Sequence, residues 1–273
     1  MNKITILGSG TSTGIPMVGC QCKVCQSTDV KDQRLRTSAF IEALNGQSIL
    51  IDTTPDLRAQ LLNHQITRVD AAIITHDHAD HLNGIDDLRP LCFHSCSDSP
   101  DEIPLFTYAE CAERIEQRFG YAFARDKKVL GGGVPKLSLE QVEYDSKTQI
   151  AGQKFEFFLN PHGGMKTLAF VHQSMAYVID CQSISRSNIE WLKNKNLELL
   201  IIDCVRDTPH QTHLHLERAL DYIQQIRPKK AGLIHMGHQL SHQKLTELGH
   251  KQENVDVFPC FDGQVLTYPA ISG

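Results

Sequence analysis

The sequence predicts an α/β fold in four layers, α/β/β/α, in which two packed sheets are covered by helices on their outer faces. Short apolar runs alternate with helical patterns through most of the 273 residues. Two pairs of expected strands follow each other closely, 38–44 with 47–52 across Asn45-Gly46, and 166–171 with 175–180. A doubly wound parallel sheet would contain fewer such pairs, so two sheets with antiparallel parts are favoured.

The expected strands are short and are bounded by Gly, Asn, Asp or Pro. They span residues 3–7, 38–44, 47–52, 71–75, 104–108, 154–160, 166–171, 175–180, 198–203, 231–235 and 264–268. The expected helices span about 55–64, 84–91, 109–119, 185–194, 213–226 and 241–249. Thr212 is the predicted N-cap of the helix 213–226, which Pro228 ends. Because no linker or repeat is found, we expect one domain over residues 1–273, with 131–135 as a glycine-rich loop tip.

The composition is that of an ordinary globular protein, with 41% hydrophobic and 22% charged residues. A formal net charge of -5 argues against broad nucleic-acid binding, which needs a basic face. No apolar run approaches the roughly 18 residues of a membrane span. The chain begins directly with an expected strand, so we expect no signal peptide and a cytoplasmic location.

The densest group of metal-binding side chains is His76-Asp77-His78-Ala79-Asp80-His81, directly after the apolar run 71–74. A closed structural zinc site has four ligands and prefers sulfur, whereas clustered His and Asp suit ions that keep a position open for water or substrate. The spacing lets the first two histidines converge on one ion. The adjacent Asp80-His81 pair can then turn toward a second ion.

A single histidine or aspartate also lies at the end of each of three other expected strands. His162 follows the run 155–159, Asp180 closes 176–179 and His235 closes 231–234. Each alone could be a capping or turn residue. Together with the group at 76–81 they indicate one site, because strand ends support residues that need precise geometry.

Nine cysteines in a chain of this size fit free thiols or metal ligands better than disulfides. Cys20, Cys22 and Cys25 lie on one short loop and form a zinc clamp that lacks one ligand. His238, three residues beyond His235, is the expected fourth ligand. We expect the others to be small buried apolar residues: Cys92, Cys96, Cys111, Cys181, Cys204 and Cys260.

These metal-binding residues occur in the same order as in the metallo-β-lactamase fold superfamily, together with Asp52 after a strand. Nearly the whole chain resembles that superfamily. The resemblance implies two groups of ligands, His76, His78 and His162 for one ion and Asp80, His81 and His235 for a second. It also implies that Asp180 bridges the two ions and that Asp52 orients the ligands.

Within that superfamily, the zinc clamp, the opening Gly8-Ser9-Gly10-Thr11-Ser12 and the segment 84–89 are similar to the PhnP-type phosphoribosyl cyclic phosphodiesterases. That resemblance implies two divalent catalytic ions, zinc or manganese, one structural zinc, a small phosphodiester substrate and a homodimer. The catalytic residues would be Asp80, Asp180 and His213, the last contacting the phosphate and assisting proton transfer. Alternatively, His213 only caps its helix and His210 or His215 takes that role.

Three other functions remain open. They are a tRNA 3′-processing endonuclease, a glyoxalase-II-like thioesterase and a non-catalytic metal-bearing protein of cofactor biosynthesis. Stable nucleic-acid binding is not expected of this acidic chain. The sequence departs from the family pattern at Cys181, and in a stretch near 92–103 with His94, Cys96 and Pro100. That stretch could line the pocket, which leaves the substrate open.

Overall fold

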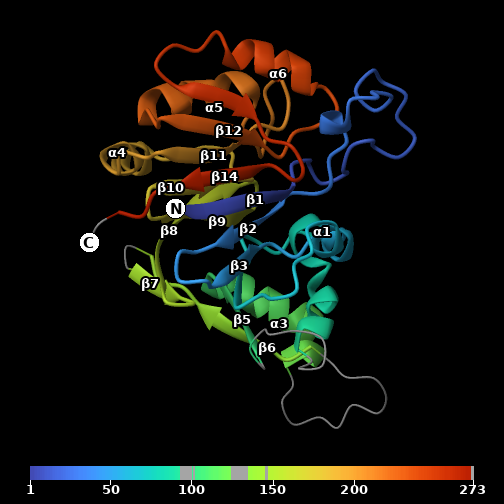
Figure 1. Cartoon of the computed structure of the whole chain (residues 1–273), viewed down its shortest axis with the longest axis vertical. Coiled ribbons are helices and arrows are strands. Elements are labelled where there is room, and N and C mark those ends of the chain that lie inside the picture. Colours follow the sequence, from blue (N-terminus) through green and yellow to red (C-terminus); the bar gives the residue numbers. More distant parts are fainter. Residues whose placement is uncertain (93–99, 101, 124–134, 145–146, 272–273) are drawn as a thin grey trace.

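Two seven-stranded sheets lie face to face, with helices on both outer faces (Figure 1). The computed structural model describes residues 1–92, 100, 102–123, 135–144 and 147–271. The predicted four-layer α/β/β/α architecture is confirmed. Most of the glycine-rich loop tip at 131–135 and of the stretch 92–103 lies outside the described residues.

The first sheet is built mainly from the first half of the chain. Its pairing is antiparallel from β14 to β3 and parallel from β3 to β6. The strand order is β14 (Val265–Tyr268), β1 (Asn2–Gly8), β2 (Ser38–Glu42), β3 (Ser48–Ile51), β4 (Ala71–Ile73), β5 (Ile103–Thr107) and β6 (Leu137–Gln141).

The second sheet repeats the same plan, antiparallel from β7 to β10 and parallel from β10 to β13. Both predicted strand pairs, β2–β3 and β9–β10, are antiparallel neighbours. The strand order is β13 (Asp256–Pro259), β12 (Lys230–Ile234), β11 (Leu199–Asp203), β10 (Met175–Val178), β9 (Met165–His172), β8 (Gln153–His162) and β7 (Lys147–Ile150).

The helices were predicted in type and order, with three differences. The segment predicted as a helix at 84–91 is a 3-10 helix, and two short helices, η1 and α2, were not predicted. The helices are η1 (Val30–Asp32), α1 (Leu57–Asn63), α2 (Ala79–Leu82), η2 (Ile85–Cys92), α3 (Ala109–Phe123), α4 (Arg186–Asn194), α5 (Leu216–Ile226) and α6 (His242–Gly249). No described helix is long and apolar enough to cross a membrane.

The start of α5 corrects the sequence prediction. The helix begins at Leu216 with His215 as its N-cap, so Thr212 does not cap it and residue 213 is not helical. The backbone N–H of Val205 donates to the carbonyl of Leu214 at 2.9 Å. This contact holds the segment before α5 alongside the end of β11, where it cannot form helical hydrogen bonds.

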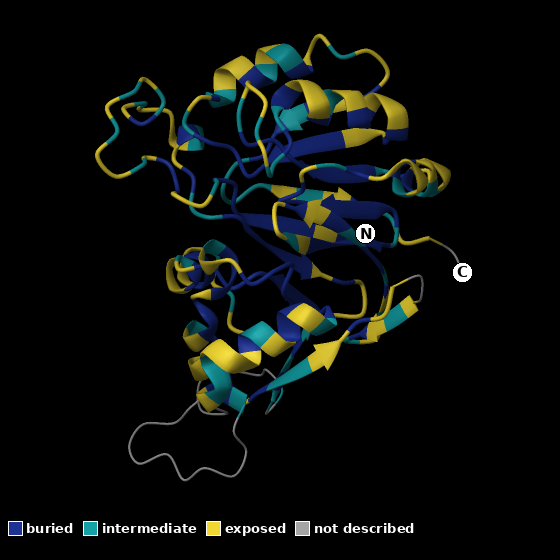
Figure 2. Cartoon of the chain, turned by 180° about the vertical axis from the view of Figure 1, so that it is seen from behind, coloured by how far each residue is buried: buried dark blue, intermediate teal, exposed yellow. Residues whose placement is uncertain are grey.

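Two apolar clusters hold the layers together. One fills the space between the sheets and reaches under α1 and α3, and the other lies between the second sheet and α4, α5 and α6. Figure 2 shows the strands as mostly buried and the helices as exposed on one side only. The cysteines expected to be small apolar residues are buried and free, apart from Cys96, which is not among the described residues. Burial of this kind supplies most of the stabilisation of a domain.

Candidate metal centre

The predicted ligands meet at one edge of the two sheets. In the first sheet, parallel β3 and β4 end just before Asp52 and residues 76–81. In the second, β8, β10 and β12 run in one direction and end at or just before His162, Asp180 and His235. Strands that run in parallel end at the same edge of a sheet, so residues far apart in the sequence come together there.

His76, His78 and His162 direct one ring nitrogen each toward a common position. Nδ1 of His78 lies 3.0 Å from Nε2 of His76 and 3.2 Å from Nε2 of His162. These separations are close to about 3.3 Å, the edge of a tetrahedron with metal–nitrogen bonds of about 2.0–2.1 Å. The other nitrogens of His76 and His162 contact the hydroxyl of Thr75 and the carbonyl of Thr212, which fixes the rings. This group therefore fits a divalent ion.

Asp80, His81, Asp180 and His235 form a second group, with ligand atoms within 4.8 Å of one another. Nε2 of His81 lies 3.1 Å from Asp80 and 3.4 Å from Asp180, yet it makes no hydrogen bond to a described residue. Oδ1 of Asp180, 3.1 Å from Nδ1 of His235, also has no hydrogen-bond partner within the part of the chain that the structure describes. Buried polar atoms without partners are rare, and a cation would satisfy both. Asp180 also lies 3.7 Å from His76, between the two groups.

Asp52 contacts His81 and fixes the orientation of its ring within the second group. Its Oδ2 lies 2.7 Å from Nδ1 of His81, and the carboxylate accepts hydrogen bonds from the amide and hydroxyl of Thr75. Burial lowers the pKa of His81, but the carboxylates of Asp180, Asp80 and Asp52 outweigh it and raise that pKa well above its usual value. Three carboxylates around one imidazole, two of them buried, leave an excess of negative charge, which a metal cation would compensate.

Three of these strand-end residues adopt the left-handed backbone conformation. The φ angle is 61° at Asp52, 47° at Asp180 and 61° at His235. For residues other than glycine this conformation costs on the order of 1 kcal/mol each, and it concentrates at functional sites. Here the turn directly after the strand directs each side chain toward the common edge.

The zinc clamp also forms a compact group. Cys20, Cys22, Cys25 and His238 place one ligand atom each within 4.8 Å of the others, and Nδ1 of His238 lies 3.1 Å from Sγ of Cys20. The backbone N–H of Cys25 lowers the pKa of Cys22 to about 6, which favours the metal-binding thiolate. Burial raises the pKa of Cys25 to about 11, so a metal would have to displace its proton. Three sulfurs and one nitrogen match a closed structural zinc site.

The zinc clamp and the second ligand group share one support. The loop that carries the cysteines extends from the body of the molecule in Figure 1. Its base is joined to the segment after β12, where the amide of Met236 donates to the carbonyl of Ser9 at 3.0 Å. The hydroxyl of Thr11 lies 3.1 Å from Nε2 of His235. Because His235 and His238 lie on this one segment, the clamp can stabilise the position of the second ligand group.

His213 lies beside Asp180 and contacts a carboxylate that the sequence analysis missed, Asp203. Nδ1 of His213 is 3.3 Å from Oδ2 of Asp203 and 4.0 Å from Oδ2 of Asp180. Burial lowers the pKa of His213, but the two carboxylates outweigh it and raise that pKa to about 9. Asp203 ends β11 much as Asp180 follows β10, and this was the sequence signal that could have identified it.

A hollow of about 610 Å³, the central pocket, opens over both ligand groups, and its lining includes His78, Asp80, His162 and His213. Its volume is in the range of small-molecule sites. Of the three histidines considered for proton transfer, His213 is the one in this lining.

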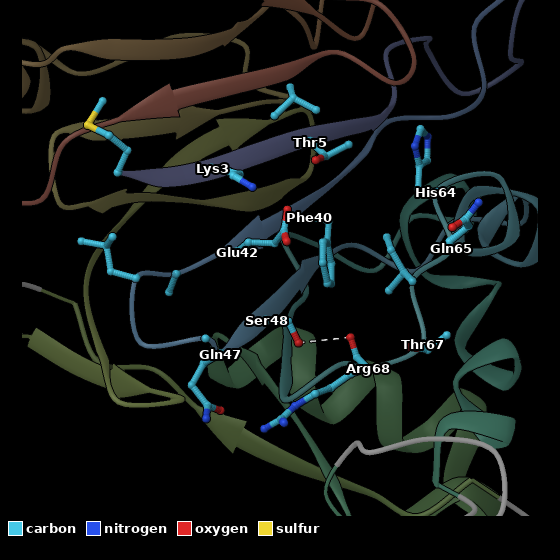
Figure 3. Close-up of a pocket in the computed structure, with 16 residues that line it drawn as sticks. Lys3, Thr5, Phe40, Glu42, Gln47, Ser48, His64, Gln65, Thr67 and Arg68 are labelled. Carbon is cyan, nitrogen blue, oxygen red and sulfur yellow. Dashed lines mark hydrogen bonds between the residues drawn. The ribbon is translucent and has the colours of Figure 1, made fainter.

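A separate hollow of about 660 Å³ lies over β1, β2 and β3 (Figure 3). Its lining includes Lys3, Glu42, Ser48 and Arg68, and Ser48 donates a hydrogen bond to the carbonyl of Arg68. None of the metal-binding groups found among the described residues lies there. The central pocket is therefore the candidate site.

This fold and this donor set define a class of protein, the metal-dependent hydrolases with metallo-β-lactamase architecture. Comparison with known proteins agrees. The sequence model of the beta-lactamase superfamily domain matches residues 47–236, and the chain belongs to this superfamily. It is also similar to the solved structure of a diphosphatase from the PhnP family, with 31% identity, a TM-score of 0.86 and 99% of each chain covered. The resemblance stated from the sequence is thus confirmed.

Two other similar proteins are informative. An octanoyltransferase from Porphyromonas gingivalis is 38% identical over 255 residues, which are 93% of this chain and 48% of that protein. The chain therefore spans about half the length of this curated relative. Zinc-bound PqqB from Methylobacterium extorquens is 14% identical with a TM-score of 0.79, covering 97% of this chain and 100% of that one. At that identity the likeness concerns the fold alone.

Proposed function

We propose that this chain is a dinuclear metal-dependent phosphodiesterase that opens a small cyclic phosphodiester. The observation that carries the proposal is the position of Asp180 between two groups of ligand atoms, beside His213. One divalent ion would be held by His76, His78 and His162. The second would be held by Asp80, His81 and His235, and Asp180 would bind both ions. Imidazole and carboxylate accept zinc or manganese, and the zinc clamp would hold one structural zinc.

The chemistry follows from these roles. Bound divalent ions lower the pKa of water and neutralise charge on phosphate oxygens. Burial lowers the pKa of His213, but Asp203 and then Asp180 raise it to about 9, which favours the protonated ring near neutral pH. Its Nδ1 is held by Asp203, so Nε2 is the ring atom that would donate a proton to the leaving oxygen of the diester. Asp203 acts as a positioning residue in this scheme.

The alternatives account for fewer features. A net charge of -5 disfavours a nuclease that grips tRNA. An octanoyl group needs an apolar wall, whereas the described lining of the central pocket is largely polar, with Met165 as its large apolar side chain. A thioesterase of the glyoxalase II type does not account for the zinc clamp, and a complete ligand set favours catalysis over a non-catalytic role. By resemblance, the proposal includes a homodimer in the cytoplasm.

Hydrolysis of bis(p-nitrophenyl) phosphate by the metal-loaded chain tests this proposal. We expect activity in the wild type. With a 2′,3′-cyclic nucleotide, whose alkoxide leaving group needs a proton, kcat should fall by about 100-fold or more in His213→Ala with unchanged metal content. His210→Ala is the matched control, because His210 lies beside His213 but outside the lining of the central pocket. Absence of hydrolysis with two catalytic ions bound would favour a non-catalytic protein. Parallel loss of metal in His213→Ala would make His213 a ligand.

A further inference from the structure

One short segment after β12 supplies a ligand to each of two metal-binding groups. His235 belongs to the second ligand group, and His238 belongs to the zinc clamp. Two residues, Met236 and Gly237, lie between them in the sequence. A backbone shift of this segment therefore moves both ligands, and any contact that fixes the segment acts on both groups.

Gly237 is held on two sides. Its N–H donates to the carbonyl of Val205, just after β11, at 2.8 Å, and a Cβ atom on Gly237 would lie 2.8 Å from the same carbonyl oxygen. The segment therefore approaches the end of β11 more closely than a residue with a side chain would permit. On the other side, the carbonyl of Gly237 accepts a hydrogen bond from Nη1 of Arg34 at 3.3 Å.

The guanidinium of Arg34 is buried, and all three of its nitrogens make hydrogen bonds. Besides the contact with Gly237, Nη2 donates to Oδ1 of Asp32 at 3.0 Å and Nε donates to the carbonyl of Lys31 at 3.3 Å. The Arg34 side chain has no exposed surface, and the carboxylate of Asp32 is buried beside it. Because a buried charge requires a partner and hydrogen bonds, these contacts determine where the guanidinium lies.

Arg34 also closes the loop that carries the clamp cysteines. Its backbone N–H and carbonyl each pair with the backbone of Ile15 at 2.8 Å. The loop between these two residues contains all three cysteines of the zinc clamp. A zinc ion would join this loop to His238, while the Arg34 side chain joins the base of the same loop to Gly237.

A further set of contacts leads from Arg34 to the ring of His235. A Cβ atom on Gly10 would lie 2.8 Å from Cβ of Arg34, so the loop after β1 packs directly on this side chain. The carbonyl of Gly10 accepts a hydrogen bond from the hydroxyl of Thr37 at 2.8 Å, and that hydroxyl lies 3.1 Å from Nδ1 of His235. Arg34 thus supports His235 both through the backbone of the segment 235–238 and through residues that contact its ring.

We propose that Arg34 is a positioning residue that couples metal binding in the zinc clamp to metal binding in the second ligand group. This inference rests on the proposed function, because it concerns the catalytic ions assigned there. Zinc in the clamp restricts the loop and His238, and Arg34 holds the adjoining segment in the same arrangement. His235 then binds its ion with a smaller loss of conformational freedom. Because such coupling is reciprocal, an ion in the second group also strengthens zinc binding in the clamp.

Metal titration of the full chain tests the coupling without requiring turnover. The chain is stripped of metal, one equivalent of Zn²⁺ is added for the clamp, and Co²⁺ is then titrated while its visible absorption is recorded. A His78→Ala background removes a ligand of the first group and reports the affinity of the second. An Asp80→Ala background reports the affinity of the first group. Thiolate charge-transfer absorption would reveal any Co²⁺ that enters the clamp instead.

Cys22→Ser empties the clamp. In the His78→Ala background it should weaken Co²⁺ binding about tenfold, a typical coupling between two sites. With the clamp filled, Arg34→Met should weaken binding by about the same factor, and adding Cys22→Ser should then change it by less than about twofold. In the Asp80→Ala background, the affinity of the first group should stay within about twofold in every variant. A purely structural loss would lower both affinities.

Arg34→Lys keeps a positive charge for Asp32 but lacks the fork that reaches Asp32 and Gly237 together. It should fold, retain the clamp zinc and keep part of the coupling, so it carries the test if the unpaired buried carboxylate unfolds Arg34→Met. Arg68→Met is the matched control, because Arg68 also pairs with an aspartate two residues away, Asp70 at 2.7 Å, but lines the separate hollow of Figure 3. It should keep the full coupling.

A second-group affinity that does not depend on the clamp overturns the inference, as does full clamp dependence in both Arg34→Met and Arg34→Lys. An equal loss of affinity in both ligand groups also overturns it, since Arg34 would then only stabilise the fold. The proposed phosphodiesterase function fails separately. Normal coupling in a wild type that does not hydrolyse bis(p-nitrophenyl) phosphate would support the inference and refute that function alone.

Discussion

Replacing Asp203 with asparagine should shift the alkaline limb of the pH–rate profile to lower pH. Asp203 is buried, and its Oδ2 accepts hydrogen bonds from the amides of Cys181 and Leu214 beside Nδ1 of His213. Asparagine can keep an oxygen toward these donors. Its amide nitrogen would take the place of Oδ1, which has no hydrogen bond to a described residue. The substitution therefore removes a charge with little rearrangement.

The size of the shift in the alkaline limb follows from the pKa of His213. Burial lowers that pKa, but Asp203, and after it Asp180, raise it from 6.5 to about 9. At about 1.4 kcal/mol per pKa unit, this favours the protonated ring by about 3 kcal/mol. Asp203 is the largest of the raising influences, so its loss should lower the pKa of His213 by about 1–2 units.

Both the activity and the stability contributed by His213 are lost as the pH rises. A proton donor must be protonated, so activity is present below the pKa of His213 and is lost as the pH rises through it. The folded-state pKa of about 9 lies above the unfolded value of 6.5. The contribution of this group to stability is therefore complete below pH 6.5 and is lost as the pH rises through 9.

The assay is kcat for a 2′,3′-cyclic nucleotide, whose alkoxide leaving group needs the proton of His213, between about pH 6 and pH 10, with metal content measured for each protein. The alkaline limb of Asp203→Asn should lie about 1–2 units below that of the wild type. Asp207→Asn, which changes an exposed carboxylate paired with Lys244, should leave the limb in place. An unchanged limb in an Asp203→Asn protein that retains its metal would refute the reasoning.

Three further substitutions test other parts of the account. Asp180→Asn should lower kcat by more than about 100-fold and reduce the content of catalytic metal; full activity would exclude a bridging role. Cys22→Ser should release one zinc per chain and lower the melting temperature, because metal binding is coupled to folding; retained zinc would contradict the clamp. Gly84→Ala places a Cβ 1.8 Å from the carbonyl oxygen of Thr54 and should destabilise the fold by about 3 kcal/mol, measured by denaturant unfolding. Gly120→Ala, a position inside α3 where the Cβ meets nothing within 4 Å, is the control that should be at least as stable as the wild type.

The sequence predicted the layers of the fold and brought the right residues into one site because both depend on local signals. Apolar runs located most of the strands, and single polar residues directly after them marked His162, Asp180 and His235. Ligands at strand ends need no knowledge of the packing, since parallel strands end at one edge. The Cys-rich loop was equally visible because its spacing is local.

What the sequence did not predict depends on contacts between distant segments. Three strands were missed, β6, β7 and β13, because they are partly exposed edge strands with few apolar residues. The start of α5 was misplaced because backbone contacts with the end of β11 override its helical pattern. The contact between Asp203 and His213 emerged only from tertiary packing, although the position of Asp203 at the end of β11 was a local signal that could have identified this residue.

Anomalous X-ray scattering from crystals grown with the catalytic metal tests the central claim most directly. The account predicts one peak within the group His76, His78 and His162, a second within Asp80, His81 and His235, and Asp180 in contact with both. A third peak should lie in the zinc clamp. A single peak at the clamp, with no metal near Asp180, would contradict the account.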